Sequence, residues 1–229
     1  ESEPDEGAAD RKIPVPRGKL LGGSSAINGM VFVRGQKQDY DQWAQLGNRG
    51  WSFEDVLPIF RDMESYNGDG DAKFRGTGGP LRISDNVEEG PLYDGIIEAA
   101  SKFGIDYNAD YNGAKQDGIG MTQTTIRKGR RMSTAFCYLN PARSRPNLTI
   151  LANALTEALI LEGKKCNGVR YTRKGATKIA MANREVIVSG GTINSPQLLE
   201  LSGIGQPDIL KTHGIEVRHE LKGVGENLR

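Results

Sequence analysis

The sequence predicts a mixed fold of the α/β to α+β type, in which helices alternate with short strands. Residues 91–103 repeat apolar side chains at helical spacing, and residues 185–188, Glu-Val-Ile-Val, form a short β-branched run. Two glycines at 190–191 separate this run from a helix start, Ser-Pro, at 195–196. The order strand, glycines, helix is typical of doubly wound folds, which use it beside a nucleotide.

Composition narrows the class of protein. The 229 residues carry a net charge of +1, which gives no basic footprint for nucleic acid, and no apolar run approaches the length of a membrane span. Cys137 and Cys166 have neither zinc nor redox spacing, so we expect a reducing, cytoplasmic compartment, with peripheral attachment to a membrane left open. The acidic residues 1–6 resemble neither a signal nor a transit peptide and are expected to form a loop.

The first half of the chain predicts one strong helix and one strand. Ser52 and Asp55 form a capping box before the apolar residues of a helix that reaches Met63, with a kink expected at Pro58. A polar, glycine-rich loop at 68–79 indicates a boundary between layers or domains, and the alternation at 80–84 predicts a short strand.

The second half predicts further helices and strands around a basic turn. The helix at 91–103 should end at Gly104, and Ser133 should cap another helix that ends near Pro146. The basic turn at 127–131 could cover an anionic ligand, although a solvated hairpin is favoured because charge runs usually face water. Strands are expected at residues 121–126, 148–152, 168–173, 178–181 and 184–189.

The stretch Gly22-Gly23-Ser24-Ser25 is the first candidate for binding. The glycines lack Cβ, so their backbone N–H groups can approach a ligand closely, and the serines add hydroxyl groups. A helix beginning near Ala26 would direct its N-terminus to the same place, which suits an anion. From these residues alone, a phosphate contact and a plain turn are equally favoured.

Residues for acid–base chemistry are scarce. His213 and His219 are the only histidines, and a structural role at the surface is favoured for each over catalysis. The glycine pairs in 203–205 and 223–225 are interpreted as turns because neither stands between a strand and a helix. No nucleophile motif, metal-ligand spacing or prominent carboxylate pair occurs, so the sequence predicts no catalytic residue and no metal site.

Two long stretches carry a resemblance to a known family. Residues 18–30, Gly-Lys-Leu-Leu-Gly-Gly-Ser-Ser-Ala-Ile-Asn-Gly-Met, continue to Asp39-Tyr40-Asp41 and closely resemble the first signature of the glucose–methanol–choline (GMC) oxidoreductases. Residues 191–205 resemble the second signature, and residues 129–135 also look familial. The chain is most similar to the choline dehydrogenase-like alcohol dehydrogenases of this family, which are flavoenzymes that use FAD.

The resemblance implies parts of two domains. Residues 1–79 and 147–229 would belong to a Rossmann-like FAD-binding domain, and residues 80–146 to an antiparallel-sheet substrate domain. The family's Gly-x-Gly-x-x-Gly turn and its catalytic histidine have no counterpart in the chain, so we expect an internal fragment of a longer enzyme.

The resemblance also implies the residues that contact FAD. Thr156 would offer its backbone to the adenine, and Gly190 and Gly191 would let the following helix pack close to the nucleotide. Ile27 stands where some relatives carry a histidine that bonds FAD covalently, so non-covalent FAD is expected. The residues along the pyrophosphate and isoalloxazine would be Gly22, Gly23, Ser24, Ser25, Asn28, Gly29, Met30 and Val31.

The implied activity is FAD-dependent oxidation of a small-molecule alcohol, with hydride passing from the CH–OH group to the flavin. The alcohol, the electron acceptor, the choice between oxidase and dehydrogenase and the oligomeric state are left open. Two alternatives also stay open: an inactive or non-enzymatic flavoprotein fragment, and a lyase or decarboxylase on the same scaffold.

Overall fold

The computed structural model describes residues 2–4, 6–86 and 90–228, which fall into two compact units. Unit 1 is Glu1–Leu148 and unit 2 is Thr149–Arg229. Helices and small sheets occur in both, which confirms the predicted α/β to α+β class. The division lies two residues from the predicted boundary at 146/147, whereas residues 79 and 80 share one unit. How the three predicted segments divide between the domains of a longer enzyme stays a prediction.

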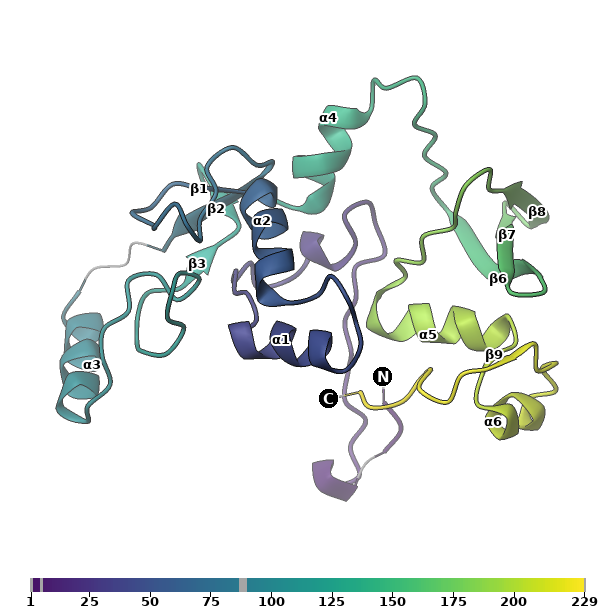
Figure 1. Ribbon diagram of the computed structural model, residues 1–229, viewed down its shortest axis with the longest axis horizontal. Helices are drawn as coiled ribbons and strands as arrows, with labels where there is room; N and C mark the ends of the chain where they lie inside the picture. Colours follow the sequence, from purple (N-terminus) through teal and green to yellow (C-terminus); the bar gives the residue numbers. More distant parts are fainter. Residues whose placement is uncertain (1, 5, 87–89, 229) are drawn as a thin grey trace. The chain divides into compact units, whose positions relative to one another are not determined.

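Two helices of unit 1 lie next to each other (Figure 1), and aromatic side chains pack between them. They are α1 (Lys37–Gln45) and α2 (Phe53–Met63), and the Ser52–Asp55 capping box predicted for α2 is present. Tyr40 of α1 is buried, with its ring centroid 5.6 Å from that of Phe60. Pro58 lies inside α2 as predicted, whereas α1 was not anticipated because its own capping box uses a glutamine, Gln36, at the N-cap.

A three-stranded sheet follows α2 directly. Strand β1 (Glu64–Tyr66) pairs in parallel with β2 (Leu81–Asp85), and β2 pairs antiparallel with β3 (Gln123–Thr124). The loop between β1 and β2 packs against the end of α2: a Cβ on Gly76 would lie 1.8 Å from the carbonyl oxygen of Arg61. The glycine-rich loop therefore permits close backbone packing inside unit 1.

The rest of unit 1 is made of shorter elements than the sequence predicts. The expected strand at 121–126 is divided into β3 and β4 (Ile126–Arg127), and β4 forms a hairpin with β5 (Arg130–Arg131). The expected helix after Ser133 consists of the π-helical turn η3 (Ala135–Leu139) and α4 (Asn140–Ala142), with Ser133 Oγ accepting from the Phe136 N–H at 3.3 Å.

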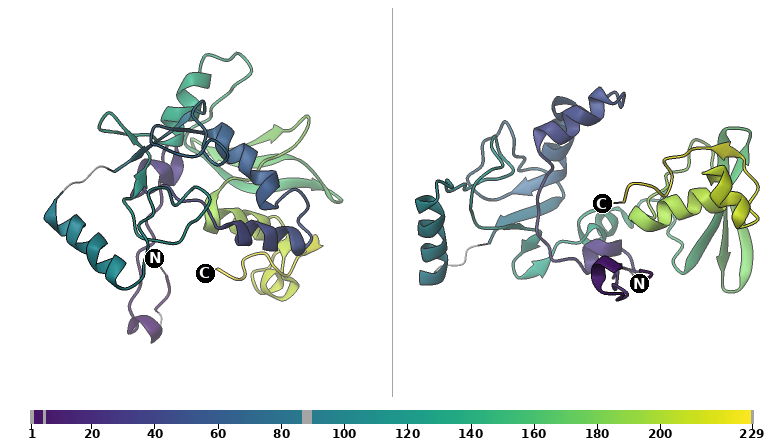
Figure 2. Two further views of the ribbon diagram at one scale, coloured as in Figure 1. Left: turned by 60° about the vertical axis from the view of Figure 1, so that its left-hand side comes forward. Right: turned by 90° about the horizontal axis from the view of Figure 1, so that it is seen from below.

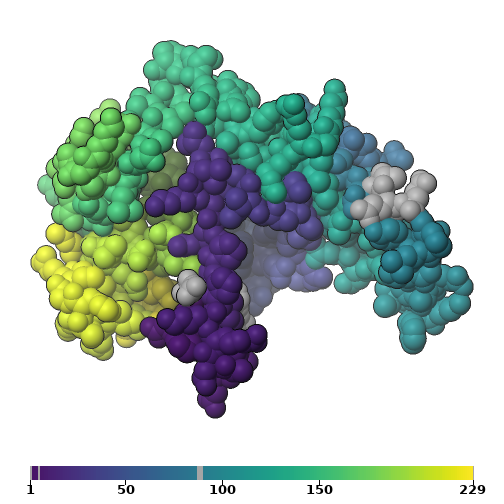
Figure 3. Space-filling view, turned by 180° about the vertical axis from the view of Figure 1, so that it is seen from behind, coloured from purple at the N-terminus to yellow at the C-terminus, as the bar shows by residue number. Residues whose placement is uncertain are grey.

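Helix α3 (Pro91–Lys102) confirms the predicted helix and its end before Gly104, whose φ is 77°. Much of its apolar face is exposed within unit 1, with Leu92 70% and Ile96 47% exposed, whereas Ala100 of the same face is buried. Near the N-terminus the chain forms the 3-10 turn η1 (Glu6–Ala8), and residues 11–17 are exposed. In the space-filling view these first residues, coloured purple, stand out at the surface (Figure 3).

A buried ionic cluster joins the sheet of unit 1 to its loops. Glu64 has no exposed surface, and its Oε1 lies 2.8 Å from Arg34 Nη2 and 2.8 Å from Arg75 Nε. Arg75 also donates to Asp110 Oδ1 at 2.5 Å and to Gln123 Oε1 at 2.8 Å. Two guanidinium groups and two carboxylates therefore balance in charge. Burial lowers the pKa of Arg34, and the charge of Glu64 opposes this effect.

Unit 2 is built on an antiparallel meander (Figure 2). Strands β6 (Ala154–Glu162), β7 (Lys165–Arg173) and β8 (Ala176–Met181) are adjacent in sequence order. The strands predicted at 168–173 and 178–181 are confirmed within β7 and β8. The strand predicted at 148–152 is wrong, because pairing with β7 begins only at Ala154.

The buried strand predicted at 184–189 is also wrong. These residues form no strand among those the structure describes, and Ile187 is 78% exposed. A β-branched run favours extended backbone, but a strand also needs a neighbour to accept and donate its hydrogen bonds, and the described part of unit 2 supplies none.

Helix α5 (Gly191–Leu201) begins four residues before the predicted start and contains Pro196 in its first turns. Its end is fixed to the sheet through Ser202, whose buried hydroxyl donates to Leu198 O at 2.6 Å and accepts from the Leu159 N–H at 2.8 Å. The remaining elements are β9 (Ile204–Gly205), α6 (Pro207–Thr212) and β10 (His219–Glu220). Gly203, with φ 84°, follows the helix as the predicted turn residue.

We expect Glu64→Gln to lower the free energy of unfolding by about 3–5 kcal/mol, because it leaves two buried guanidinium groups short of a counter-charge. The matched control is Glu98→Gln, which removes an exposed pair with Lys102 at 2.7 Å and should cost less than about 1 kcal/mol. Denaturant unfolding of both variants measures the difference. Equal stability of the two variants would contradict the importance of the cluster.

We expect Ser202→Ala to destabilise unit 2 by about 1–3 kcal/mol, because the buried Leu159 N–H loses its acceptor. Thr212 makes the same kind of bond, to Asp208 O at 2.9 Å, but at an exposed position. Thr212→Ala should therefore change stability by about 0.5 kcal/mol or less. Thermal unfolding compares the two, and a Ser202→Ala change as small as the control would rule out the proposed link.

Candidate functional site

The glycine-rich segment of unit 1 folds as a tight turn followed by the 3-10 turn η2 (Gly23–Ala26), so the longer helix predicted near Ala26 is not formed. Gly22 and Gly23 have φ values of 94° and 54°, a left-handed conformation that favours glycine. A Cβ on Gly18 would lie 2.1 Å from Gly23 O. The turn therefore requires glycine at these positions for its own geometry.

The two serine hydroxyls have different environments. Ser25 Oγ donates to Gly22 O at 2.6 Å and accepts from the Thr134 N–H at 3.0 Å, so it locks the turn to a residue far along the chain. Ser24 Oγ accepts from the Gly18 N–H at 3.1 Å, and Ser24 itself is exposed. Of the two, Ser24 is the one left accessible to a ligand.

Arg131 binds the same segment, which sequence reasoning missed. Its Nη1 donates to both the carbonyl and the side-chain oxygen of Asn28, at 2.7 Å each, and to Ser25 O at 3.3 Å. The other four residues of the basic turn are exposed, as expected for a solvated hairpin. The resemblance of residues 129–135 to the family drew attention to this turn but could not identify the partner of Arg131. Arg131 and Asn28 are 103 positions apart in the chain, so no local sequence pattern links them.

Met30 is held in a left-handed conformation with φ 64°. Its N–H donates to Asn28 Oδ1 at 3.2 Å, and its carbonyl accepts from the Thr125 N–H at 2.8 Å. A non-glycine residue in this region costs about 1–3 kcal/mol and persists only when its surroundings fix it. The strain therefore lies inside the stretch that sequence analysis singled out.

One side of the segment is open. A Cβ on Gly23 or on Gly29 would meet no described atom within 4 Å, and Gly29 does not have a left-handed φ. Ile27 and Val31 are 47% and 55% exposed. Backbone without side chains, flanked by exposed apolar residues, can receive a flat apolar ring together with hydrogen-bonding groups.

Unit 2 contains a groove of about 910 Å³ between its sheet and α5. Thr156 and Gly190 both line it, so the structure brings these two predicted residues together. Arg170 also lines the groove and pairs with Glu157 at 3.4 Å. The other side is formed by the irregular residues 186–189 and by Leu198 of α5.

Gly190 and Gly191 stand at the start of α5. A Cβ on Gly190 would lie 3.2 Å from Asn194 Cβ, which is a tight contact, and Gly191 has φ 88° with open space around it. Both positions therefore favour glycine, one for packing and one for conformation. The eight predicted residues between Gly22 and Val31 belong to unit 1, whereas Thr156, Gly190 and Gly191 belong to unit 2.

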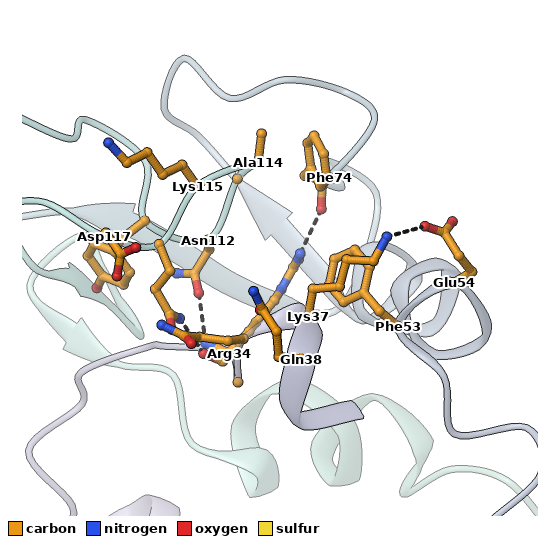
Figure 4. Close-up of a pocket in the computed structure, with 15 residues that line it drawn as sticks. Arg34, Lys37, Gln38, Phe53, Glu54, Phe74, Asn112, Ala114, Lys115 and Asp117 are labelled. Carbon is orange, nitrogen blue, oxygen red and sulfur yellow. Dashed lines mark hydrogen bonds and ion pairs between the residues drawn. The ribbon is translucent and has the colours of Figure 1, made fainter. Parts of the chain in front are cut away.

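Unit 1 has a hollow of about 420 Å³ at the beginning of α1 (Figure 4). Its charged groups are largely engaged: Lys37 Nζ lies 3.5 Å from Glu54 Oε1, and Arg34 Nη1 donates to Phe74 O at 2.7 Å. Asn112 closes one side, where its Oδ1 accepts from the Arg34 N–H at 2.7 Å.

The described residues offer little for acid–base or metal chemistry. His213 ends α6 and His219 lies in β10, and both are exposed. Within residues 2–4, 6–86 and 90–228, no group of three His, Cys, Asp or Glu side chains could hold a metal ion. In the same residues, no helix has both the length and the apolar character needed to cross a bilayer.

We expect Arg131→Ala to loosen residues 25–28, because three carbonyl or amide oxygens lose their common donor. Arg130 is exposed and belongs to the same hairpin, so Arg130→Ala is the matched control. Hydrogen exchange of the Ile27 and Asn28 amides should be faster in Arg131→Ala, and the variant should lose about 1–3 kcal/mol of stability. Unchanged exchange at these amides would show that Arg131 does not hold the segment.

Comparisons with curated proteins show close relatives over the whole chain. It is 45% identical over 228 residues to the oxygen-dependent choline dehydrogenase of Sinorhizobium medicae (strain WSM419), and 47% identical over 228 residues to that of Brucella anthropi. In both cases the match covers 100% of this chain and 41% of the relative. The chain thus spans less than half the length of these relatives.

Solved structures show the same fold. An FAD-dependent oxidoreductase from Chaetomium thermophilum matches with a TM-score of 0.92 and 31% identity, over 99% of this chain and 41% of the other. The pyridoxine 4-oxidase of Mesorbium loti matches with a TM-score of 0.89 and 31% identity, over 96% of this chain and 44% of the other.

The match to a family model is equally extensive. Residues 7–229 match the model described as GMC oxidoreductase. The match covers nearly the whole chain, including the stretches at 18–41 and 191–205, the glycine-rich segment of unit 1 and the groove of unit 2. The chain therefore belongs to the GMC oxidoreductase family.

Proposed function

We propose that the protein binds FAD without a covalent bond and oxidises a small alcohol. The observation that carries the proposal is the open side of the glycine-rich segment: a rigidly held backbone with room for a ligand at Gly23 and Gly29. Family membership and the FAD-dependent neighbour of known structure support FAD as the ligand.

The residues present fit this cofactor. Gly22, Gly23 and Ser24 would receive the pyrophosphate with backbone N–H groups and a hydroxyl, and Asn28 to Val31 would border the ring system. Ser25 would act indirectly, since its hydroxyl holds the turn. At Ile27 the side chain has no nucleophilic atom, which supports non-covalent binding. Within unit 2 itself, Thr156, Gly190 and Gly191 are proposed as adenine contacts, and Thr156 and Gly190 line its groove.

When bound, FAD supplies the hydride-accepting chemistry. The described residues would orient the cofactor and exclude water from one face, since the exposed side chains of Ile27 and Val31 are apolar. No described residue is assigned as the base for the alcohol proton, because both histidines are exposed and lie in unit 2. We infer that the protein functions in the cytoplasm, which the two free cysteines, Cys137 and Cys166, support.

The first test is purification with its cofactor. A yellow protein with a flavin spectrum, whose colour passes into the supernatant on acid precipitation, is the expected result. Protein that retains the colour in the pellet would contradict non-covalent binding, and a colourless protein that takes up no added FAD would contradict the proposal itself.

The substrate class is tested by mixing candidate alcohols with the flavin-loaded protein in the absence of oxygen and measuring loss of the flavin absorbance. Choline and pyridoxine are the first donors to try, because relatives and neighbours are named for them. Bleaching by an alcohol, and return of the colour on admitting oxygen, would support an alcohol oxidation with oxygen as acceptor. Failure of every alcohol in a flavin-loaded protein would favour another chemistry on this scaffold.

We expect Gly29→Val to weaken FAD binding without unfolding the protein. Its Cβ enters empty space at an ordinary φ, but the side chain would occupy the ligand's place, an overpacking worth about 1–3 kcal/mol, or about tenfold or more in Kd. Gly78→Val is the control, since Gly78 is equally open in a different loop of unit 1. Flavin titration and thermal unfolding compare the two, and equal affinities would exclude Gly29 from the site.

A further inference from the structure

The backbone at 30–34 is fastened along one edge only. Phe32 N–H donates to Gln123 O at 2.8 Å, and Phe32 O accepts from Tyr111 Oη at 2.9 Å and from Asn112 Nδ2 at 3.2 Å. Arg34 continues the pattern, with its N–H on Asn112 Oδ1 at 2.7 Å (Figure 4). The even-numbered residues of this extended stretch therefore face their partners inside unit 1.

The odd-numbered residues present the opposite edge. The backbone groups of Val31 and Val33 make no hydrogen bond with any residue the structure describes, and their side chains are 55% and 59% exposed. Alternation along extended backbone explains the contrast, because successive peptide groups point in opposite directions. A ligand at Gly29 to Val31 would meet this free edge.

Tyr111 and Asn112 are themselves rigidly held. Tyr111 Oη accepts from the Gln123 N–H at 2.6 Å, and Asn112 Nδ2 donates to Gln123 Oε1 at 2.7 Å. Gln123 has no exposed surface and is bound in turn by Arg75 of the ionic cluster. Burial raises the pKa of Tyr111, which keeps its hydroxyl protonated as the donor to Phe32.

We propose that Tyr111 and Asn112 are positioning residues for the flavin: they fix the carbonyl of Phe32 and the N–H of Arg34, and thereby set where the free edge at Val31 meets the ring. This inference rests on the proposed function. Both side chains bond directly to the backbone of Phe32 or Arg34. Both act through the backbone, so their effect is on the placement and electronic surroundings of the flavin.

The test compares Tyr111→Phe with Tyr66→Phe in the flavin-loaded protein. Both changes remove one hydroxyl from the same polar network: Tyr66 Oη donates to Asp85 at 2.8 Å and accepts from Gln123 Nε2 at 3.2 Å, but it makes no hydrogen bond with residues 30–34 in the part of the chain that the structure describes. Each variant is measured for thermal unfolding, FAD dissociation constant, visible spectrum, flavin reduction potential and hydrogen exchange at residues 32–34.

Both variants should unfold at lower temperature. Only Tyr111→Phe should speed exchange at residues 32–34, shift the visible spectrum and the potential, and raise the Kd for FAD by about fivefold or more. If Tyr111→Phe fails to fold, Asn112→Ser, which removes the bonds to Phe32 and Arg34, is measured in its place with the same expected shifts.

Two outcomes would overturn the inference, and they are distinguishable. A parent protein that takes up no FAD overturns the proposed function, and the positioning role with it. A parent protein that binds FAD, together with a Tyr111→Phe variant that matches Tyr66→Phe in spectrum, potential and Kd, overturns the positioning role alone and leaves FAD binding intact.

Discussion

Glu64 occupies the first position of β1 with no exposed surface, between the guanidinium groups of Arg34 and Arg75. A carboxylate in such a place is stable only when its charge is met and its oxygens are hydrogen-bonded. Arg75 carries the cluster on to Asp110 and Gln123. This ionic cluster thus joins the end of α2, the loop after β1, the loop at 110–112 and β3.

Gln123 connects this cluster to the backbone at residues 30–34. Its side chain accepts a hydrogen bond from Arg75. Its backbone carbonyl accepts from the Phe32 N–H, and its backbone N–H donates to Tyr111 Oη. The strained Met30 is fixed next to this point by Thr125. A strained non-glycine residue requires surroundings that fix it, and for Met30 these are its hydrogen bonds with Asn28 and Thr125. The buried polar side chains of unit 1 therefore fix the position of the backbone as well as stabilising the fold.

Unit 2 uses a simpler device. Its meander forms by local pairing of adjacent strands, and Ser202 joins the end of α5 to β6 through two hydrogen bonds of one hydroxyl. The groove between the helix and the sheet follows from this connection, with Thr156 on the strand and Gly190 before the helix. Glycine at 190 and 191 lets the helix begin there, since one site is crowded and the other is left-handed.

The sequence by itself determined the local features: the Ser52–Asp55 capping box, the helix at 91–102, the hairpin at 126–131 and the glycine turn at 22–23. These depend on residues within a few positions of one another. Tertiary structure alone decided which polar side chains meet, such as Arg131 with Asn28 and Tyr111 with Phe32. Among the residues that the structure describes, it also provides no strand partner for the run at 185–188. Periodicity and propensity report local preference, whereas ion pairs, strand partners and the accessible side of a segment arise only when distant parts of the chain come together.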